Sequence, residues 1–262
     1  MRVAEFDGTR LHFRVDGDLT GAPVLFINSL GTDLRLWDPI LPFLPAGLRI
    51  IRYDKRGHGL SDAPPAPYSM GTLVRDAEQL LDMLDVRDAM VVGLSIGGMI
   101  AQGLAVKRLD LVRALVLSNT GAKIATREIW DTRIDTARRD GVAALAQGTM
   151  ERWFSREFLD RPELALWQNM FEQTSLDGFT GCSAAIRGTD FYTPTSGLRL
   201  PTLGIGGSED GGTPPDLVRE TVDLIPGSRF ELIRRAGHLP CVERPETYAA
   251  MLTDFFTETG HV

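Results

Sequence analysis

Residues 93–97 form the part of the sequence best suited to covalent chemistry. This segment fits the pattern G-x-S-x-G, with Ser95 at its centre, and it lies between an apolar run at 89–92 and a helix-like segment at 98–106. A sharp turn from strand to helix needs small residues on either side of its central residue, which it presents at the N-terminus of the helix. We therefore predict that Ser95 is a nucleophile; the alternative is a loop that serves only packing.

A serine hydroxyl is a weak nucleophile, so a general base must accompany it. Of the four histidines, His238 follows the apolar run 230–233 and thus lies at the carboxyl end of a predicted strand, where ligands bind in parallel sheets. We predict that His238 is the base. For the other three we expect an exposed or half-buried strand residue at His12, a hydrogen bond within a glycine-rich loop at His58 and a frayed chain end at His261.

The imidazole in turn needs a carboxylate that fixes its tautomer. The chain has 35 acidic residues, so chain order must decide: with a serine on a strand-to-helix turn, the acid follows the serine and precedes the histidine. Asp210, at the end of the segment 203–210, is the predicted acid, and Glu209 is its nearest rival. Asp54 comes before the serine and is expected to fix a loop by hydrogen bonding. Residues 118–120 contain no carboxylate, which favours Asp210 further.

A tetrahedral intermediate needs two backbone donors where its oxyanion forms. One is expected at the amide of Ile96, the residue after the nucleophile. The other is expected in the loop 28–31, after the apolar run 24–27, where we favour the amide of Leu30. The sequence contains no H-E-x-x-H motif, Walker loop or G-x-G-x-x-G fingerprint, so we expect no metal and no nucleotide cofactor.

The elements that must position these side chains alternate along most of the chain. Short apolar runs bounded by Gly, Pro, Asp and Ser predict buried strands, and stretches such as 73–84 and 245–256 have the three- and four-residue spacing of helices. This alternation indicates an α/β fold, with a mostly parallel sheet flanked by helices. Residues 2–15 alternate in polarity instead and predict an antiparallel hairpin at the sheet edge. The predicted sheet strands are 24–27, 49–53, 89–93, 114–117, 202–205 and 230–233.

The strand rhythm stops between residues 121 and 190. This region contains no strand-like run, and its helix-like pieces are rich in arginine and aromatic residues. We predict an α/β core at 1–120 and 191–262 and an inserted all-helical cap at 121–190, not independent because no Pro/Gly-rich linker separates the two. The helix-like pieces are 128–139, 142–154, 163–171 and 181–187.

Composition excludes several classes of protein. The chain of 262 residues has 43% hydrophobic and 24% charged residues, which is ordinary for a globular domain. Its net charge of −7 lacks the basic field that nucleic acids and anionic membranes attract, so we expect neither partner. Cys182 and Cys241 show no metal-ligand spacing and are expected to be buried thiols.

Two further features bear on the compartment. The charged N-terminal segment has no apolar core of a signal peptide, and the uncharged stretch 89–106 predicts a strand followed by a helix rather than a membrane span. Together with the low cysteine count, these features favour a cytoplasmic protein. The sequence leaves the oligomeric state open.

Together these residues resemble the α/β-hydrolase fold over nearly the whole chain. Residues 52–62, Arg-Tyr-Asp-Lys-Arg-Gly-His-Gly-Leu-Ser-Asp, are similar to the loop after the fourth strand of that superfamily. Most members carry a His-Gly pair in the oxyanion loop, whereas residues 28–33 here are Asn-Ser-Leu-Gly-Thr-Asp. That variant resembles the 3-oxoadipate enol-lactonases of bacterial aromatic catabolism. Further segments that carry this narrower resemblance are 93–98, 117–120, 152–154 and 182–186.

The resemblance implies a reaction, the hydrolysis of 3-oxoadipate enol-lactone to 3-oxoadipate. Ser95 would attack the ring carbonyl with His238 as base, and a water activated by His238 would release the product from the acyl-enzyme. The alternative is a general carboxylesterase or a cofactor-free perhydrolase of the same fold. A non-catalytic binding module of this fold is disfavoured because the serine, the acid and the histidine are all present.

The implied substrate is a small anionic lactone, whereas the protein is net acidic. A local cation must therefore hold the substrate carboxylate, preferably an arginine because of its two-pronged geometry. Arg133 and Arg152 are the candidates, and each can instead be solvated or paired with a neighbouring acid. The aromatic residues near them can line the substrate pocket or pack the cap; they are Trp130, Trp153, Phe154 and Trp167.

Overall fold

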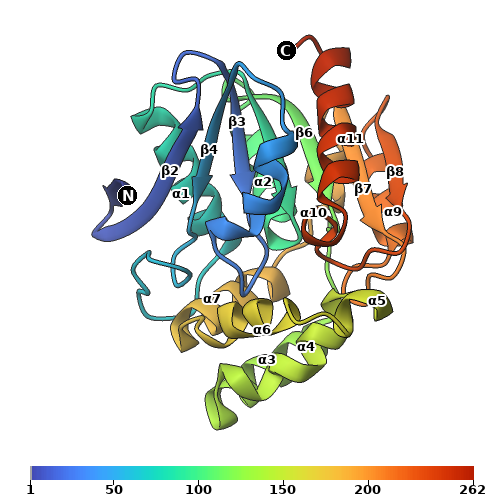
Figure 1. The fold of residues 1–262 in the computed structure, drawn as a ribbon. Coiled ribbons are helices and arrows are strands. Elements are labelled where there is room, and N and C mark those ends of the chain that lie inside the picture. The colour runs from blue at the N-terminus through green and yellow to red at the C-terminus, as the bar shows by residue number, and fades with distance from the viewer. Residues whose placement is uncertain (1) are drawn as a thin grey trace.

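A single sheet of eight strands forms the centre of the molecule over residues 2–262, which the computed structural model describes (Figure 1). Only the first residue of the predicted core lies outside the described part. The strand order is β1-β2-β4-β3-β5-β6-β7-β8. β2 pairs antiparallel with both neighbours, and all later pairings are parallel. The strands are β1 (Arg2–Phe6), β2 (Thr9–Gly17), β3 (Ala22–Ile27), β4 (Leu48–Tyr53), β5 (Ala89–Leu94), β6 (Val112–Ser118), β7 (Thr202–Gly207) and β8 (Arg229–Ile233).

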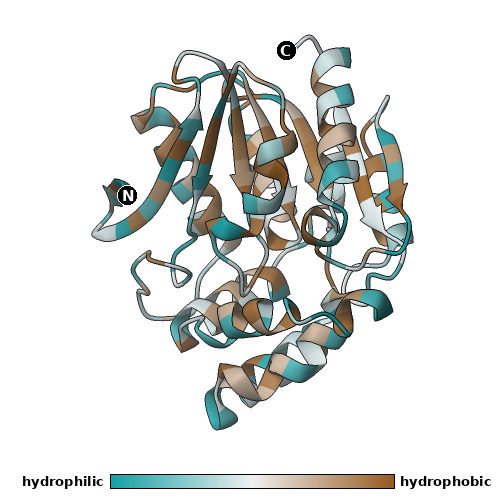
Figure 2. Cartoon of the chain, viewed as in Figure 1, coloured by the Kyte–Doolittle hydropathy of each residue, from teal (hydrophilic) through white to brown (hydrophobic). Residues whose placement is uncertain are grey.

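The central strands are buried on both faces. Every residue of β5 and of β7 is buried, which explains why both are continuous small or apolar runs rather than alternating ones. Figure 2 shows this apolar centre among more polar outer elements. β1 and β2 pair as the antiparallel hairpin predicted from alternation, and β1 lies at the sheet edge. The predicted mostly parallel sheet is therefore confirmed.

Helices cover both faces of this sheet. The predicted helices at 73–84 and 245–256 correspond to α1 and α11, with ends that differ by at most three residues. α2 follows β5 directly, so the uncharged stretch 89–106 is a strand and a helix. Within residues 2–262 no helix is both long and apolar enough to cross a membrane. The helices that cover the sheet are η1 (Leu34–Phe43), α1 (Met70–Met83), α2 (Ile96–Lys107), α9 (Pro215–Asp223), α10 (Pro240–Glu243) and α11 (Pro245–Glu258).

A layer of helices between β6 and β7 lies across the carboxyl ends of the parallel strands (Figure 1). Of the described residues between 121 and 190, none belongs to a strand, as expected of an all-helical cap. The predicted helix at 142–154 is divided into η2 and α4, and α7 begins at Leu176, after its cap Ser175 and earlier than predicted. The elements are α3 (Arg127–Asp140), η2 (Val142–Leu145), α4 (Ala146–Trp153), α5 (Arg156–Leu159), α6 (Leu164–Glu172), α7 (Leu176–Arg187) and, leading back to the core, α8 (Tyr192–Ser196).

Candidate active site

Ser95 lies on a strained turn between β5 and α2. Its backbone has φ 60° and ψ −120°, a conformation that costs a non-glycine residue about 1–3 kcal/mol. The turn is tight, because a Cβ atom at Gly93 would lie 2.3 Å from the carbonyl oxygen of Gly97, and one at Gly97 would lie 2.0 Å from the carbonyl oxygen of Ile27. The two glycines therefore allow this tight turn, which presents Ser95 at the start of α2.

His238 and Asp210 are brought together at the carboxyl edge of the sheet. Asp210 follows β7 and His238 follows β8, and the His238 Nδ1 atom lies 2.8 Å from Asp210 Oδ2. The backbone amide of His238 donates to the carbonyl of Trp153 at 2.7 Å, and the Trp153 ring stacks on the imidazole. The cap thus contacts the histidine directly. In the described structure no hydrogen bond joins Ser95 Oγ to His238.

The Asp210 carboxylate is held by donors on every side. Oδ1 accepts from the amides of Gly212 at 2.7 Å and Thr213 at 3.0 Å, and Oδ2 also accepts from the Thr213 hydroxyl and from Asn119 Nδ2, both at 2.8 Å. Burial acts to raise the pKa of Asp210, but His238 and these hydrogen bonds outweigh it and hold the pKa below its ordinary value. Asp210 is therefore ionised near neutral pH. In contrast, Glu209 accepts from the amide of Arg156 at 3.1 Å, at the surface.

Besides Thr213, two further residues of this network were not identified from the sequence. Asn119, which follows β6, donates from Nδ2 both to Asp210 and to the carbonyl of Gly237. Glu243 accepts from the amide of Gly237 at 2.7 Å and from the amide and hydroxyl of Ser155, so it joins the His238 loop to the cap. The position of Asn119 at a strand's carboxyl end was an available signal, whereas the short helix that carries Glu243 gave none.

The two expected oxyanion donors lie on neighbouring segments. Ile96 is the first residue of α2, where an amide has no intrahelical partner, and Leu30 lies in the loop between β3 and η1. Neither amide donates a hydrogen bond to any atom of the described chain. Their assignment as an oxyanion hole remains a prediction, with both donors available for it.

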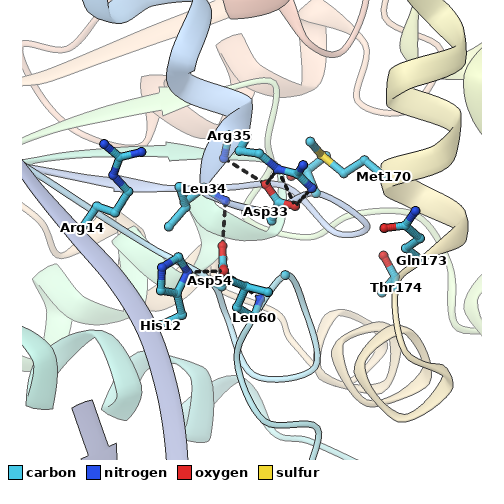
Figure 3. A pocket seen from close by; sticks show the side chains of 12 residues that line it. His12, Arg14, Asp33, Leu34, Arg35, Asp54, Leu60, Met170, Gln173 and Thr174 are labelled. Carbon is cyan, nitrogen blue, oxygen red and sulfur yellow. Dashed lines mark hydrogen bonds and ion pairs between the residues drawn. The ribbon is translucent and has the colours of Figure 1, made fainter. Parts of the chain in front are cut away.

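His12 and Asp54 form a second buried histidine–carboxylate pair, which lines a pocket at the seam of core and cap (Figure 3). His12 Nδ1 lies 2.8 Å from Asp54 Oδ2, and the carboxylate accepts from the amides of Leu34 and Leu60. The expected loop-fixing role of Asp54 is confirmed. The expectation that His12 is exposed or half-buried is wrong, because its imidazole is buried beside Asp54 of the loop after β4. Ser95 does not line this pocket.

The remaining histidines also serve structure. His58 Nε2 accepts a hydrogen bond from the amide of Gly31 at 3.0 Å, and its Nδ1 lies 3.2 Å from the carbonyl oxygen of Arg56, within its own loop as expected. His261 is buried against the ring of Phe256, so the expected frayed chain end is wrong. The two cysteines are buried free thiols, as predicted.

The neutral state of His58 predicts a pH-dependent stability. Burial and then the positive charge of Lys55 hold the pKa of His58 well below its ordinary value of 6.5. Below pH 6.5 His58 binds a proton in the unfolded chain but not in the folded chain. The free energy of unfolding therefore decreases as the pH falls below 6.5. We expect wild type to lose more unfolding free energy than His58→Gln between pH 7.5 and about pH 5, measured by urea denaturation. Equal losses would contradict the assignment.

Arg133 and Arg152 lie close together in the cap, without acidic partners. Across the described residues neither forms an ion pair, the Nε atom of Arg133 is buried with no hydrogen-bond partner, and Arg152 donates only to the Thr149 hydroxyl. Burial and then repulsion from Arg152 lower the pKa of Arg133 to about 10, and the guanidinium rests on the ring of Trp130. The backbone of Arg152 accepts from the amide of Gly211, beside Asp210.

The cap aromatics divide between packing and the site. The Trp130 indole donates to the carbonyl of Ile124 at 2.7 Å, and Phe154 stacks on Phe158, so both pack the cap. Trp153 stacks on His238 and belongs to the site. Trp167 is only partly buried.

Known proteins resemble this chain over almost its entire length. The alpha/beta hydrolase fold family model matches residues 22–245. The 3-oxoadipate enol-lactonase 2 of Acinetobacter baylyi is 30% identical over 240 residues, which cover 91% of this chain and 90% of that protein. Among solved structures, the enol-lactonase of Burkholderia xenovorans LB400 superposes with a TM-score of 0.94 at 35% identity, covering 98% of this chain and all of that one. Another solved structure, a thermophilic esterase from Thermogutta terrifontis, superposes with a TM-score of 0.91 at 26% identity, covering 99% of this chain and 97% of that one.

Proposed function

The chain belongs to the alpha/beta hydrolase fold family, and from this premise we propose that it is a serine hydrolase that opens 3-oxoadipate enol-lactone to 3-oxoadipate. Ser95 is the nucleophile, His238 the general base and Asp210 the carboxylate that orients the base. Similarity to enol-lactonases over nearly the whole chain supports this substrate. The observation that carries the proposal is that Arg133 and Arg152 lie in the cap with no acidic partner among the described residues.

In the first step Ser95 attacks the lactone carbonyl carbon. In the neutral imidazole that has its proton on Nδ1, His238 donates a hydrogen bond to the ionised Asp210, and its unprotonated Nε2 takes the proton from Ser95 Oγ. The carbonyl oxygen becomes an oxyanion and accepts from the amides of Leu30 and Ile96. The ring C–O bond then breaks, the leaving enolate takes the proton from His238 Nε2, and the resulting enol tautomerises to the ketone. An enol is a good leaving group, so this step needs little acid assistance.

Water completes the reaction by releasing the acyl group. His238 takes a proton from the water, which attacks the acyl carbon on Ser95, and the same two amides stabilise the second oxyanion. The ester bond to Ser95 breaks, and the serine recovers its proton from His238. The product, 3-oxoadipate, then carries two carboxylates.

The two cap arginines are suited to the acetate side chain of the substrate. The guanidinium groups of Arg133 and Arg152 are half-buried and repel each other. A carboxylate that binds both of them would therefore stabilise them. This local attraction is needed because the chain has 35 acidic and 28 basic residues, so its net field repels an anion. Trp130, on which Arg133 rests, holds that guanidinium in place.

A substitution at Arg133 tests the anion site. We expect Arg133→Ala to raise KM for the enol-lactone by about tenfold or more, because a hydrogen bond to a charged group contributes about 1.5–3 kcal/mol. KM for a neutral aryl ester should change less than about threefold. Arg138→Ala, which removes an exposed arginine from the same helix, is the matched control and should leave both values unchanged. If Arg133→Ala affects both substrates equally, the anion site is wrong.

The substrate itself is tested by comparing lactone with ester. Enol-lactone is generated in place and its ultraviolet absorbance is followed with wild-type protein, with Ser95→Ala as the blank. A kcat/KM for the lactone well above that for a p-nitrophenyl ester supports the proposal. Ester cleavage without lactone turnover would favour a general carboxylesterase or a cofactor-free perhydrolase, a reading that the similarity to the Thermogutta esterase supports.

A further inference from the structure

The loop after β4 holds the oxyanion loop at three points. Lys55 Nζ donates to the carbonyl oxygens of Asn28 at 3.0 Å and Ser29 at 2.9 Å. His58 Nε2 accepts from the amide of Gly31 at 3.0 Å. Both side chains are buried, with exposed fractions of 1% and 2%. Two side chains of one loop therefore restrain residues 28, 29 and 31, which surround the expected donor at position 30.

These contacts fix the direction of the Leu30 amide through the geometry of the peptide bond. The carbonyl of Ser29 and the N–H of Leu30 belong to one planar trans peptide unit, in which they point in opposite directions. Because Lys55 binds that carbonyl, the N–H of Leu30 points away from Lys55. It is also left without an acceptor in the described chain.

His58 fixes the next peptide unit. The amide of Thr32 donates to the carbonyl of Ser29 at 3.3 Å, which closes a turn in which Gly31 has φ +76°, the value of the third residue of a type II turn. A type I turn would require the peptide between Leu30 and Gly31 to rotate by about 180°. The hydrogen bond from Gly31 to His58 opposes that rotation.

The positive charge of Lys55 lies directly behind this turn. A buried ammonium group is costly unless it is hydrogen-bonded or paired, and Lys55 forms no ion pair with any described residue. Burial lowers the pKa of Lys55 to about 8, so at pH 7 the group is mostly charged. A neutral donor such as an amide would hold the same carbonyls without this desolvation penalty. The charge is therefore unexplained by loop structure alone.

We propose that Lys55 and His58 are positioning residues of the oxyanion hole. They orient two consecutive peptide units so that the Leu30 amide faces the tetrahedral intermediate on Ser95, and the Lys55 ammonium adds positive charge behind that donor. This inference rests on the proposed acyl transfer at Ser95, but it does not depend on the identity of the lactone.

Substitutions on the loop after β4 test this role with a neutral p-nitrophenyl ester. Lys55→Met keeps a side chain of similar length but removes the ammonium group and both of its hydrogen bonds. It should lower kcat by about 100-fold, the effect of losing one oxyanion donor, with KM changed less than about threefold. His58→Leu should lower kcat by about tenfold, whereas His58→Gln, whose amide oxygen can accept from Gly31, should keep most of it. Arg56→Met, which breaks the neighbouring ion pair with Asp76, should lower stability but not kcat.

A second measurement separates positioning from general loss of structure. An aryl boronic acid forms a tetrahedral adduct with a nucleophilic serine, so its affinity should fall in parallel with kcat across these variants, whereas substrate KM should not follow. If folded Lys55→Met keeps both kcat and boronate affinity, the inference is wrong. If Lys55→Met does not fold, equal kcat in His58→Leu and His58→Gln overturns it. If the wild-type protein cleaves no ester and a fluorophosphonate does not label Ser95, the proposed function is overturned as well.

Discussion

Ser95→Ala is expected to lower kcat for lactone and ester by about 10⁶-fold, while KM changes little. Removing the nucleophile of a serine triad leaves only the residual catalysis that comes from binding and from the oxyanion donors. The fold should persist, because the Ser95 hydroxyl makes no hydrogen bond within the described chain. The backbone strain at φ 60° should also be similar for serine and alanine, because both residues carry a Cβ atom. The melting temperature should therefore stay within a few degrees of wild type.

The measurement combines turnover with covalent labelling. Purified variants are assayed at high enzyme concentration, and a fluorophosphonate is used to label the active serine. Ser183→Ala is the matched control. Like that of Ser95, the Ser183 hydroxyl has no hydrogen-bond partner in the described chain, but Ser183 lies in α7 of the cap. It should retain full activity and labelling. Residual activity of Ser95→Ala above about 1% of wild type would show that another group attacks the substrate.

The sequence was sufficient to predict the sheet and to assign the predicted triad residues to its carboxyl edge, because both leave local signals. Central strands buried on two faces are continuous apolar runs, and the predicted runs all fall within observed strands. Loops at the carboxyl ends of such strands must then meet at one edge. This is why Ser95, Asp210 and His238 could be assigned to one edge of the sheet from chain position alone, and the structure brings Asp210 and His238 within 2.8 Å there.

Side chains that act across the fold leave no such signal. Asn119 bonds to Asp210, 91 residues away, and Glu243 bonds to Ser155, 88 residues away. Neither partner is visible from neighbouring residues. His12 gave a misleading signal, because alternation in β2 indicates two differently exposed faces but cannot show that its imidazole is buried against Asp54, 42 residues away.

The cap arginines illustrate a different limit of sequence patterns. Arg133 has Asp131 and Asp135 nearby in the sequence, so pairing with a neighbour was a reasonable alternative. In the structure Asp131 pairs with Arg187 instead, from the adjacent α7. Helix–helix packing thus decides which cation remains available, and packing of this kind depends on contacts that helical periodicity does not specify.

Asp210→Asn is expected to lower kcat by about 10⁴-fold without unfolding the protein, because it imposes the wrong tautomer on His238. The amides of Gly212 and Thr213 donate to Oδ1, so the oxygen of an asparagine must occupy that position. Its NH₂ group then replaces Oδ2 and donates to His238 Nδ1. The imidazole must accept there and carry its proton on Nε2, where it cannot take the proton of Ser95.

The same substitution places two amide groups against each other, since Asn119 Nδ2 donates to Oδ2 in the wild type. We therefore expect a modest loss of stability beside the large loss of kcat, measured by thermal denaturation and ester turnover on the same samples. Glu209→Gln is the matched control: this adjacent carboxylate binds the amide of Arg156 rather than the histidine, so kcat should stay within about twofold. If Glu209→Gln lost activity and Asp210→Asn kept it, the carboxylate that orients His238 would have to be reassigned, and with it the tautomer that makes Nε2 a base.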